Sequence, residues 1–268
     1  MAECCACSLT WNFKMVDSDM AGQFVWWRSV LDLLSSTFTR MNFLKHLPIS
    51  FRGELHNIQL INFSVDADEV SAIVPKEIQV RLINGRAMIS MVNVELEKMH
   101  PTFLPLWLQF NYRHVAFRLL ADDSKLNDGK CKGIFFFRSF TDKPMIVFGG
   151  KMISDYNLEQ VSFHIEDNSF SMKKKESFLS YEINENLLPP EIQELKETIG
   201  AIDRAYSVLN GKLRMIQIQR EKWPIEPVYC SKFETNFFKT AKFEGAFTVS
   251  ETIFYHWLPP QFINQKMK

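Results

Sequence analysis

The sequence predicts one mostly-β (α+β) domain, closed or nearly closed, with a few helices on its flanks. Short stretches in which apolar and polar residues alternate recur along the 268 residues, and turn-forming residues separate them. Two or three segments of helical periodicity are inserted between these strands, and the chain has no internal repeat. Many strands with few helices are typical of a β-sandwich or a β-barrel.

A β-hairpin is the strongest local prediction. Residues 78–82 alternate between apolar and polar, which is the period of a half-buried strand. Asn84-Gly85 follows, and both residues tolerate the positive φ angles of a type I′ turn. The return strand, residues 87–96, is apolar on both faces over much of its length, so we expect it in the interior of the sheet.

A short helix is expected directly before this hairpin. Asp66 and Glu69 are three residues apart, a spacing similar to a capping box, in which side chains pair with backbone groups of the first turn. Pro75 ends the helix because its ring cannot continue it.

We expect three parts along the chain. Residues 1–20 form a flexible arm, and residues 21–45 form an amphipathic helix that packs onto the domain rather than onto a partner or a membrane surface. Residues 46–262 form a single β domain. This domain includes a helix at about 190–210, which follows two prolines and ends at an Asn-Gly pair.

The charges argue against two classes of partner. Lys plus Arg and Asp plus Glu both number 31, so the formal net charge is zero. Nucleic-acid-binding proteins usually concentrate basic residues on one face, and an anionic membrane surface attracts the same residues. We therefore expect neither nucleic acid nor a membrane as a partner.

Cysteine usage predicts a reduced protein in the cytoplasm. Cys4, Cys5 and Cys7 lie together near the start of the chain, whereas a disulfide framework would space its cysteines along the sequence. A thiolate metal site there would need a fourth ligand and a rigid loop, which this segment does not offer. The first residues include Glu3 and no basic stretch, so they do not resemble a signal peptide.

Sequence motifs indicate neither a metal nor a cofactor. The six histidines form no ligand pattern typical of a metal site, so none is predicted. The sequence has no nucleophile elbow, no phosphate-binding loop and no dinucleotide-binding fingerprint, so we expect no cofactor.

Polar residues inside apolar strands are the candidate functional groups. Asn111, Arg113 and His114 lie within one predicted strand, and Asn111 and Arg113 share a face because side chains alternate. A buried guanidinium needs a carboxylate or a ligand anion to offset its desolvation, and the sequence leaves both interpretations of Arg113 open. Lys151 is an isolated lysine beside two glycines. A nucleophilic amine is one interpretation, but we favour a lysine whose amine reaches water.

Several segments, taken in order, resemble one protein family. They are VPKEIQVRLINGRAMISMVNVELEKM (74–99), FNYRHV (110–115), KGIFFF (132–137), REKWPIEP (220–227) and YHWLPP (255–260). Their order and spacing resemble the family labelled domain of unknown function 2071, within the acetoacetate-decarboxylase-like superfamily, over about residues 51–260. The resemblance implies a β-barrel with flanking helices and an internal cavity for a small, anionic organic molecule.

The same resemblance bears on catalysis. Acetoacetate decarboxylases hold a lysine in this cavity that forms a Schiff base with a β-keto acid, beside a second lysine that lowers its pKa. The matching positions in this sequence are Leu158 and Glu159. Since neither residue has an amine, the resemblance implies that no imine forms there.

The expected function is binding of a small anionic organic molecule without Schiff-base catalysis. The expected ligand-binding residues are Asn111, Arg113, His114, Lys151 and Tyr156. One alternative is a lyase-like or decarboxylase-like enzyme with a non-standard site around Lys151. Another is a structural protein whose cavity is filled by Phe and Met side chains. A small-molecule ligand is the expected partner, and a homo-oligomer is an open alternative to a monomer.

Overall fold

The computed structural model describes residues 45, 47–105, 107–153, 158–188, 190–220 and 223–263, with side chains of 151–153 outside this description. All of them belong to one compact unit that begins at Leu44. The expected arm over 1–20, and the expected helix over 21–45 apart from Lys45, lie outside the described residues.

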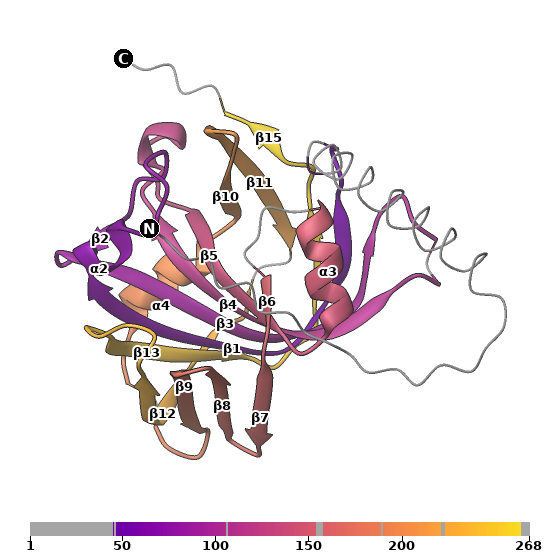
Figure 1. The fold of residues 1–268 in the computed structure, drawn as a ribbon. Helices are drawn as coiled ribbons and strands as arrows, with labels where there is room; N and C mark the ends of the chain where they lie inside the picture. The colour runs from indigo at the N-terminus through magenta and orange to yellow at the C-terminus, as the bar shows by residue number, and fades with distance from the viewer. Residues whose placement is uncertain are drawn as a thin grey trace, which may run out of the picture. The chain divides into compact units, whose positions relative to one another are not determined.

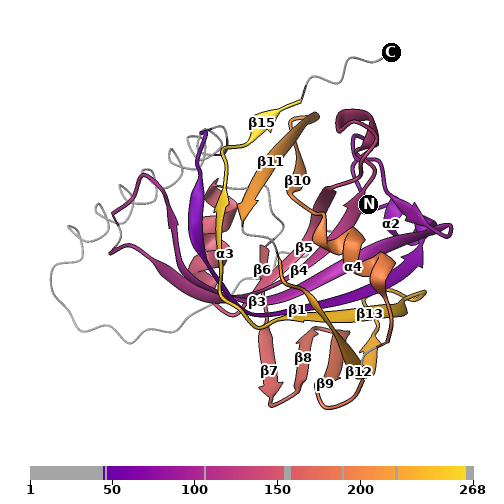
Figure 2. The ribbon, with the colours of Figure 1, turned by 180° about the vertical axis from the view of Figure 1, so that it is seen from behind.

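The described chain consists mainly of strands (Figures 1 and 2). The strands are β1 (Phe51–Asp66), β2 (Leu82–Ile83), β3 (Arg86–Pro101), β4 (Phe110–Ala121), β5 (Gly133–Thr141), β6 (Leu158–Gln160), β7 (Ser162–Glu166), β8 (Ser169–Lys174), β9 (Ser177–Asn184), β10 (Arg204–Leu209), β11 (Lys212–Arg220), β12 (Glu226–Thr235), β13 (Lys242–Val249), β14 (Ile253–Trp257) and β15 (Gln261–Phe262). The helices are α2 (Ala67–Ser71), α3 (Pro144–Ile153) and α4 (Gln193–Gly200), with a 3-10 turn over Ser124–Leu126. None of these helices has the length and apolar character that a bilayer-spanning helix needs.

Seven of the described strands close into a barrel. Strand β1 pairs with β3, which pairs with β4, and the ring continues through β5, β10, β11 and β14 back to β1. All of these pairings are antiparallel except β5 with β10, which is parallel. The predicted mostly-β barrel is therefore confirmed, and closure removes the free edges that a flat sheet would expose.

A second layer of strands covers one side of the barrel. Strand β1 also pairs with β13, and the sheet continues through β12, β9, β8 and β7. Figure 1 shows β7, β8, β9 and β12 as this separate layer. Side chains alternate along the wall and fill both sides of it. Val92 of β3 belongs to the core inside the barrel, whereas Phe117 of β4 belongs to a second core that includes Phe170 of the outer layer.

A buried polar network joins the two layers. The Asn93 amide donates to Oε1 of Gln59 at 3.0 Å and to the Tyr181 hydroxyl at 2.7 Å, and that hydroxyl donates in turn to Gln59. Arg113 Nη1 donates to the side-chain oxygen of Asn93, Oδ1, at 2.9 Å. Because Tyr181 is in β9 and the other three residues are in the barrel, the network fixes the outer layer on the barrel wall.

The predicted hairpin turn is present, but its first strand is shorter than expected. Asn84 and Gly85 have φ angles of 51° and 77°, as a type I′ turn requires. The expected strand over 78–82 forms only at its end, where Leu82 belongs to β2. Earlier in this segment, Val80 forms a single bridge with Ala121.

Two expected helices differ from the structure. Asp66 makes no side-chain cap on α2, and Glu69 instead accepts hydrogen bonds from the backbone of Lys239 and Thr240.

The helix expected at about 190–210 ends at Gly200, and β10 follows it. The Asn-Gly pair that the prediction placed as a helix cap is the tight turn of the β10–β11 hairpin, with φ angles of 52° and 70°.

Candidate ligand-binding cavity of the barrel

A cavity of about 360 Å³ lies inside the barrel. Every strand of the ring contributes to its lining, through residues that include Leu55, Val94, His114, Ile134, Ser207, Ile216 and Tyr255. Helix α3 adds Met145, Ile146 and Gly149. Small-molecule sites are typically apolar cavities with a few polar groups, and this cavity has that character.

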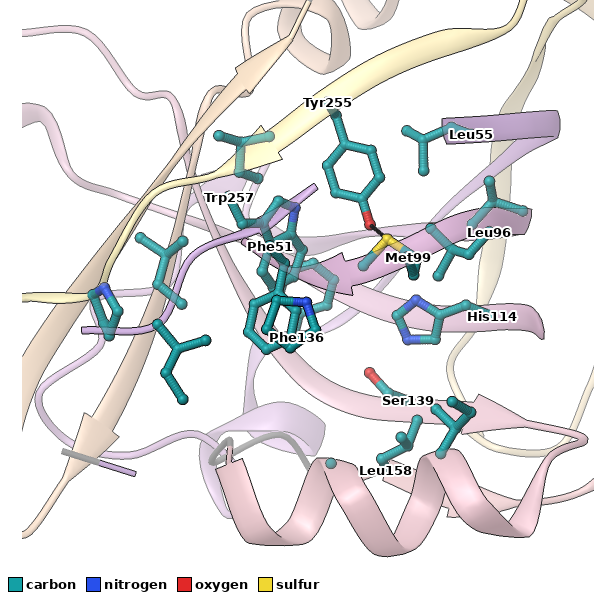
Figure 3. Close-up of a pocket in the computed structure, with 18 of the residues that line it drawn as sticks. Phe51, Leu55, Leu96, Met99, His114, Phe136, Ser139, Leu158, Tyr255 and Trp257 are labelled. Atoms are coloured by element: carbon teal, nitrogen blue, oxygen red, sulfur yellow. Dashed lines mark hydrogen bonds between the residues drawn. The ribbon is translucent and has the colours of Figure 1, made fainter. Parts of the chain in front are cut away.

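The cavity reaches the surface beside α3 and the start of β4. Phe110 and Met145 both line it, and they are 37% and 75% exposed. In Figure 3, Tyr255 points toward Met99, and its hydroxyl donates to the Met99 sulfur at 2.8 Å. Phe136 and Trp257 lie with their ring centroids 5.8 Å apart and also line the cavity, so aromatic and thioether groups form part of its lining.

Arg118 is the strongest candidate for an anion-binding group. It lines the cavity and is only 5% exposed. Its guanidinium donates from Nε to the Ser90 carbonyl oxygen at 3.1 Å and from Nη2 to the Ser90 hydroxyl at 2.8 Å. In the described part of the chain no carboxylate forms an ion pair with it. A buried charge without a counter-charge is costly, so this site favours an incoming anion.

A second guanidinium lies close to the same ring as Arg118. Arg220 also lines the cavity, and its charged group lies 4.2 Å from the Trp223 ring centroid, compared with 5.7 Å for Arg118. Burial, with a smaller contribution from the charge of Arg220, lowers the pKa of Arg118 to about 9. Burial likewise lowers the pKa of Arg220 to about 10, against the opposing effect of Asp203. Both values are above 7, so both groups are cationic at neutral pH.

Two further polar atoms in the cavity lining lack partners among the described residues. They are the Ser207 hydroxyl and the Trp223 indole nitrogen, and both atoms are buried. Buried polar atoms are nearly always hydrogen-bonded, so these two are available to a ligand or to water.

His114 supplies a neutral imidazole. Its side chain lines the cavity, and Figure 3 shows it between Met99 and Ser139. Burial lowers the pKa of His114 to about 4, and the charge of Arg118 contributes. At neutral pH the ring therefore has one N–H donor and one acceptor nitrogen.

The structure places the other predicted residues of this strand outside the cavity. Asn111 is exposed and accepts a hydrogen bond from the backbone of Lys98 at 2.9 Å, and Arg113 forms an ion pair with Glu95. The two residues were correctly predicted to share a face, but alternation in β4 turns that face away from the cavity. Of the two interpretations of Arg113, the carboxylate pair is the one observed.

The side chains of Lys151 and Tyr156 lie outside the described residues. Their roles as ligand-binding groups stay predictions. The backbone of Lys151 is part of α3, directly after Gly150, which lines the cavity.

The two positions that the family resemblance assigns to the decarboxylase lysines lie on β6. Leu158 lines the cavity and is 7% exposed, whereas Glu159 forms an ion pair with Lys174. Of these two positions, Leu158 therefore presents methyl groups to the cavity.

Four polar residues of the cavity lining are not among those predicted from the sequence: Arg118, Ser207, Arg220 and Trp223. A pattern that indicates Arg118 is present: it has the same strand parity as His114 and is flanked by apolar residues on both sides. Trp223 was noted only as part of a motif. Nothing in the local sequence associates Arg220 with Arg118, because β4 and β11 are not neighbours in the ring.

One group of potential metal ligands lies outside the cavity. Ligand atoms of Glu54, His56 and Glu97 lie within 4.8 Å of one another, on the neighbouring strands β1 and β3. This group was not predicted from the sequence. The Lys98 amine donates to Glu54 at 2.8 Å and already supplies this group with a cation.

Comparisons with known proteins agree with this fold. An acetoacetate decarboxylase-like enzyme from Sphingomonas wittichii RW1 superposes with a TM-score of 0.55 at 9% identity, over 81% of this chain and 94% of that one. An acetoacetate decarboxylase from Legionella pneumophila superposes with a TM-score of 0.55 at 10% identity, over 83% and 91%. At such low identity the likeness concerns the fold alone. No curated protein matches the sequence.

A family model also matches the sequence directly. The match covers residues 52–260, and its description is an uncharacterized conserved protein family, DUF2071. This range includes every strand of the barrel except the first residue of β1. The chain belongs to the DUF2071 family.

Proposed function

We propose that this protein binds a small organic anion, in particular a carboxylate, inside its barrel, and that Arg118 holds the anionic group. The observation that supports this most directly is the buried guanidinium of Arg118, which lines the cavity without a carboxylate partner in the described chain. A carboxylate can accept two parallel N–H bonds from one guanidinium. The Trp223 indole and the Ser207 hydroxyl line the same cavity and offer further donors.

The lining of the cavity also supports anion selectivity. Its described residues include Lys45, Arg118, Arg214 and Arg220, and no Asp or Glu. A ligand ammonium group would therefore find no counter-charge there, and burying it would be unfavourable.

Titration calorimetry with carboxylates and their uncharged amides tests the proposal. We expect carboxylates such as acetoacetate and hexanoate to bind and the matching amides to bind far more weakly. Arg118→Gln should weaken carboxylate binding by about 10- to 100-fold, as expected for loss of a charge-assisted hydrogen bond. The matched control is Arg113→Gln, in the same strand but on its outer face, which should leave the affinity within about twofold.

A stability measurement separates loss of function from loss of folding. Arg118→Met replaces a buried, unpaired charge by an apolar side chain, which is often neutral or stabilising. We expect this variant to unfold at the same or a higher temperature than the wild type while losing carboxylate binding. Unchanged carboxylate affinity in both Arg118 variants would refute the proposal.

A lyase-like enzyme is a second candidate function. It is supported by His114, a neutral imidazole in the cavity that can accept a proton, and by Lys151, which follows a cavity-lining glycine. Incubation with acetoacetate, followed by assay for carbon dioxide, tests it. Carbon dioxide formation by the wild type that is lost in both His114→Gln and Lys151→Ala would favour an enzyme over a binding protein.

We also propose that the protein works in the cytoplasm. Cys131 and Cys230 are free thiols in the described chain, which is consistent with a reducing compartment. Localisation of a fluorescent fusion in the source cell tests this.

A further inference from the structure

We infer that the ligand is an amphiphilic carboxylic acid with an aliphatic chain, bound with its carboxylate at Arg118 and its chain extended toward α3. This inference rests on the proposed function and specifies the chemical class of the ligand. A short, hydrophilic oxo acid would leave most of the cavity lining without a contact.

The two polar groups that β4 turns toward the cavity lie far apart. Arg118 follows His114 by four residues on the same strand face, which corresponds to about 13 Å along the strand. On the adjacent strand β3, Val92 lies opposite Ala116 and Val94 lies opposite His114, so this side of the wall is aliphatic. On the other neighbour, β5, Ser139 lies opposite Ala116 and is a small polar group in an otherwise apolar stretch.

Apolar side chains continue the lining to the surface. Beyond His114, the lining includes Leu96, Met99, Phe110 and Met145. Phe110 and Met145 are also exposed, as described above. A mainly apolar path, which contains uncharged polar groups such as His114 but, among the described residues, no carboxylate, thus connects the buried guanidinium with solvent. Such a path suits a chain with one charged end and not a ligand that is charged at both ends.

The part of the cavity beside α3 can hold the far end of the ligand. Leu158 presents an apolar side chain there and is 7% exposed. Gly149 of α3 also lines the cavity, and a methyl group added there would meet no atom of the described residues within 4 Å. This part of the cavity can accept additional methylene groups without a clash.

The experiment is a series of straight-chain acids from acetate to decanoate, titrated by calorimetry below their micellar concentrations. Burial of each methylene group is worth about 0.8 kcal/mol, so we expect Kd to fall roughly fourfold per added carbon until the cavity is full. 6-Aminohexanoate should bind at least about tenfold more weakly than hexanoate, because its ammonium group would be buried without a counter-charge.

Two variants locate the ends of the ligand. Arg118→Gln should weaken octanoate binding by about 10- to 100-fold and leave binding of octanol nearly unchanged. Gly149→Leu fills the open space beside α3, so the longest acids should lose affinity while butanoate keeps it.

Each other outcome has a distinct meaning. If affinity is highest for acetate or acetoacetate and does not rise with chain length, this inference is wrong and the proposed function stands. If no carboxylate binds at all, the proposed function is wrong as well. If octanoate and octanol bind equally and Arg118→Gln affects neither, the binding is nonspecific apolar adsorption, and both proposals fail.

Discussion

Arg113 and Arg118 lie on the same strand, β4, but their guanidinium groups occupy opposite faces of the barrel wall. Arg113 pairs with Glu95 on the outer face, whereas Arg118 lines the cavity and has no carboxylate partner in the described chain. Their positions differ by five, an odd number, and side chains alternate along a strand. One arginine therefore stabilises the fold, and the other is available to a ligand.

The network between barrel and outer layer predicts a stability effect. Tyr181→Phe removes a buried hydroxyl that bonds to Asn93 and Gln59. Since the amide of Asn93 loses a buried partner, we expect the free energy of unfolding to fall by about 1–3 kcal/mol in urea titrations. Tyr229, in the same outer layer, is 38% exposed and is the matched control. Tyr229→Phe should change the free energy by less than about 0.5 kcal/mol, and equal losses in both variants would contradict the role of the network.

His114 predicts a pH dependence of stability. Burial lowers its pKa from 6.5 to about 4 in the folded protein, so the unfolded chain binds a proton at pH values where the folded protein does not. Stability from this group is present above pH 6.5 and is lost as the pH falls toward 4. Between pH 7.5 and 5, we expect the wild type to lose about 2 kcal/mol more than His114→Gln.

The control for this measurement is His164→Gln. The His164 side chain is 71% exposed, so this variant should lose stability with falling pH as the wild type does. The same pH dependence in wild type and His114→Gln would show that His114 is not buried as a neutral ring.

Leu158 predicts the reactivity of an amine placed in the cavity. Leu158→Lys places an amine in an apolar cavity, where desolvation lowers its pKa and leaves it free to react with a carbonyl group. With acetoacetate and borohydride, we expect a covalent adduct that mass spectrometry detects. Glu159→Lys is the matched control, because Glu159 pairs with Lys174 and does not line the cavity.

The contrast between these two variants is the decisive result. An adduct in Leu158→Lys alone supports the assigned orientation of β6. Equal labelling of both variants would contradict it. An adduct in the wild type would indicate that another lysine reacts, and would favour the enzyme candidate.

Local sequence was sufficient for the fold class and for several turns. Asn84-Gly85 adopts its turn because only small or flexible residues tolerate positive φ at both positions. The same chemistry misled the prediction at Asn210-Gly211, where an Asn-Gly pair suits both a helix end and a hairpin. The choice there depends on whether residues 204–209 find a partner strand, and β5 and β11 supply it.

The candidate site was predictable only in part. His114 follows from its polar side chain in an apolar strand, and the family resemblance assigns the decarboxylase lysine positions to Leu158 and Glu159. Alternation shows that Arg113 and Arg118 lie on opposite faces, but it does not show which face is inside. That depends on how the ring closes and on which side the outer layer covers, and both follow from pairings between residues far apart in the chain. The proximity of Arg220 to Arg118 has the same origin, because closure of the barrel brings β4 and β11 to the same cavity.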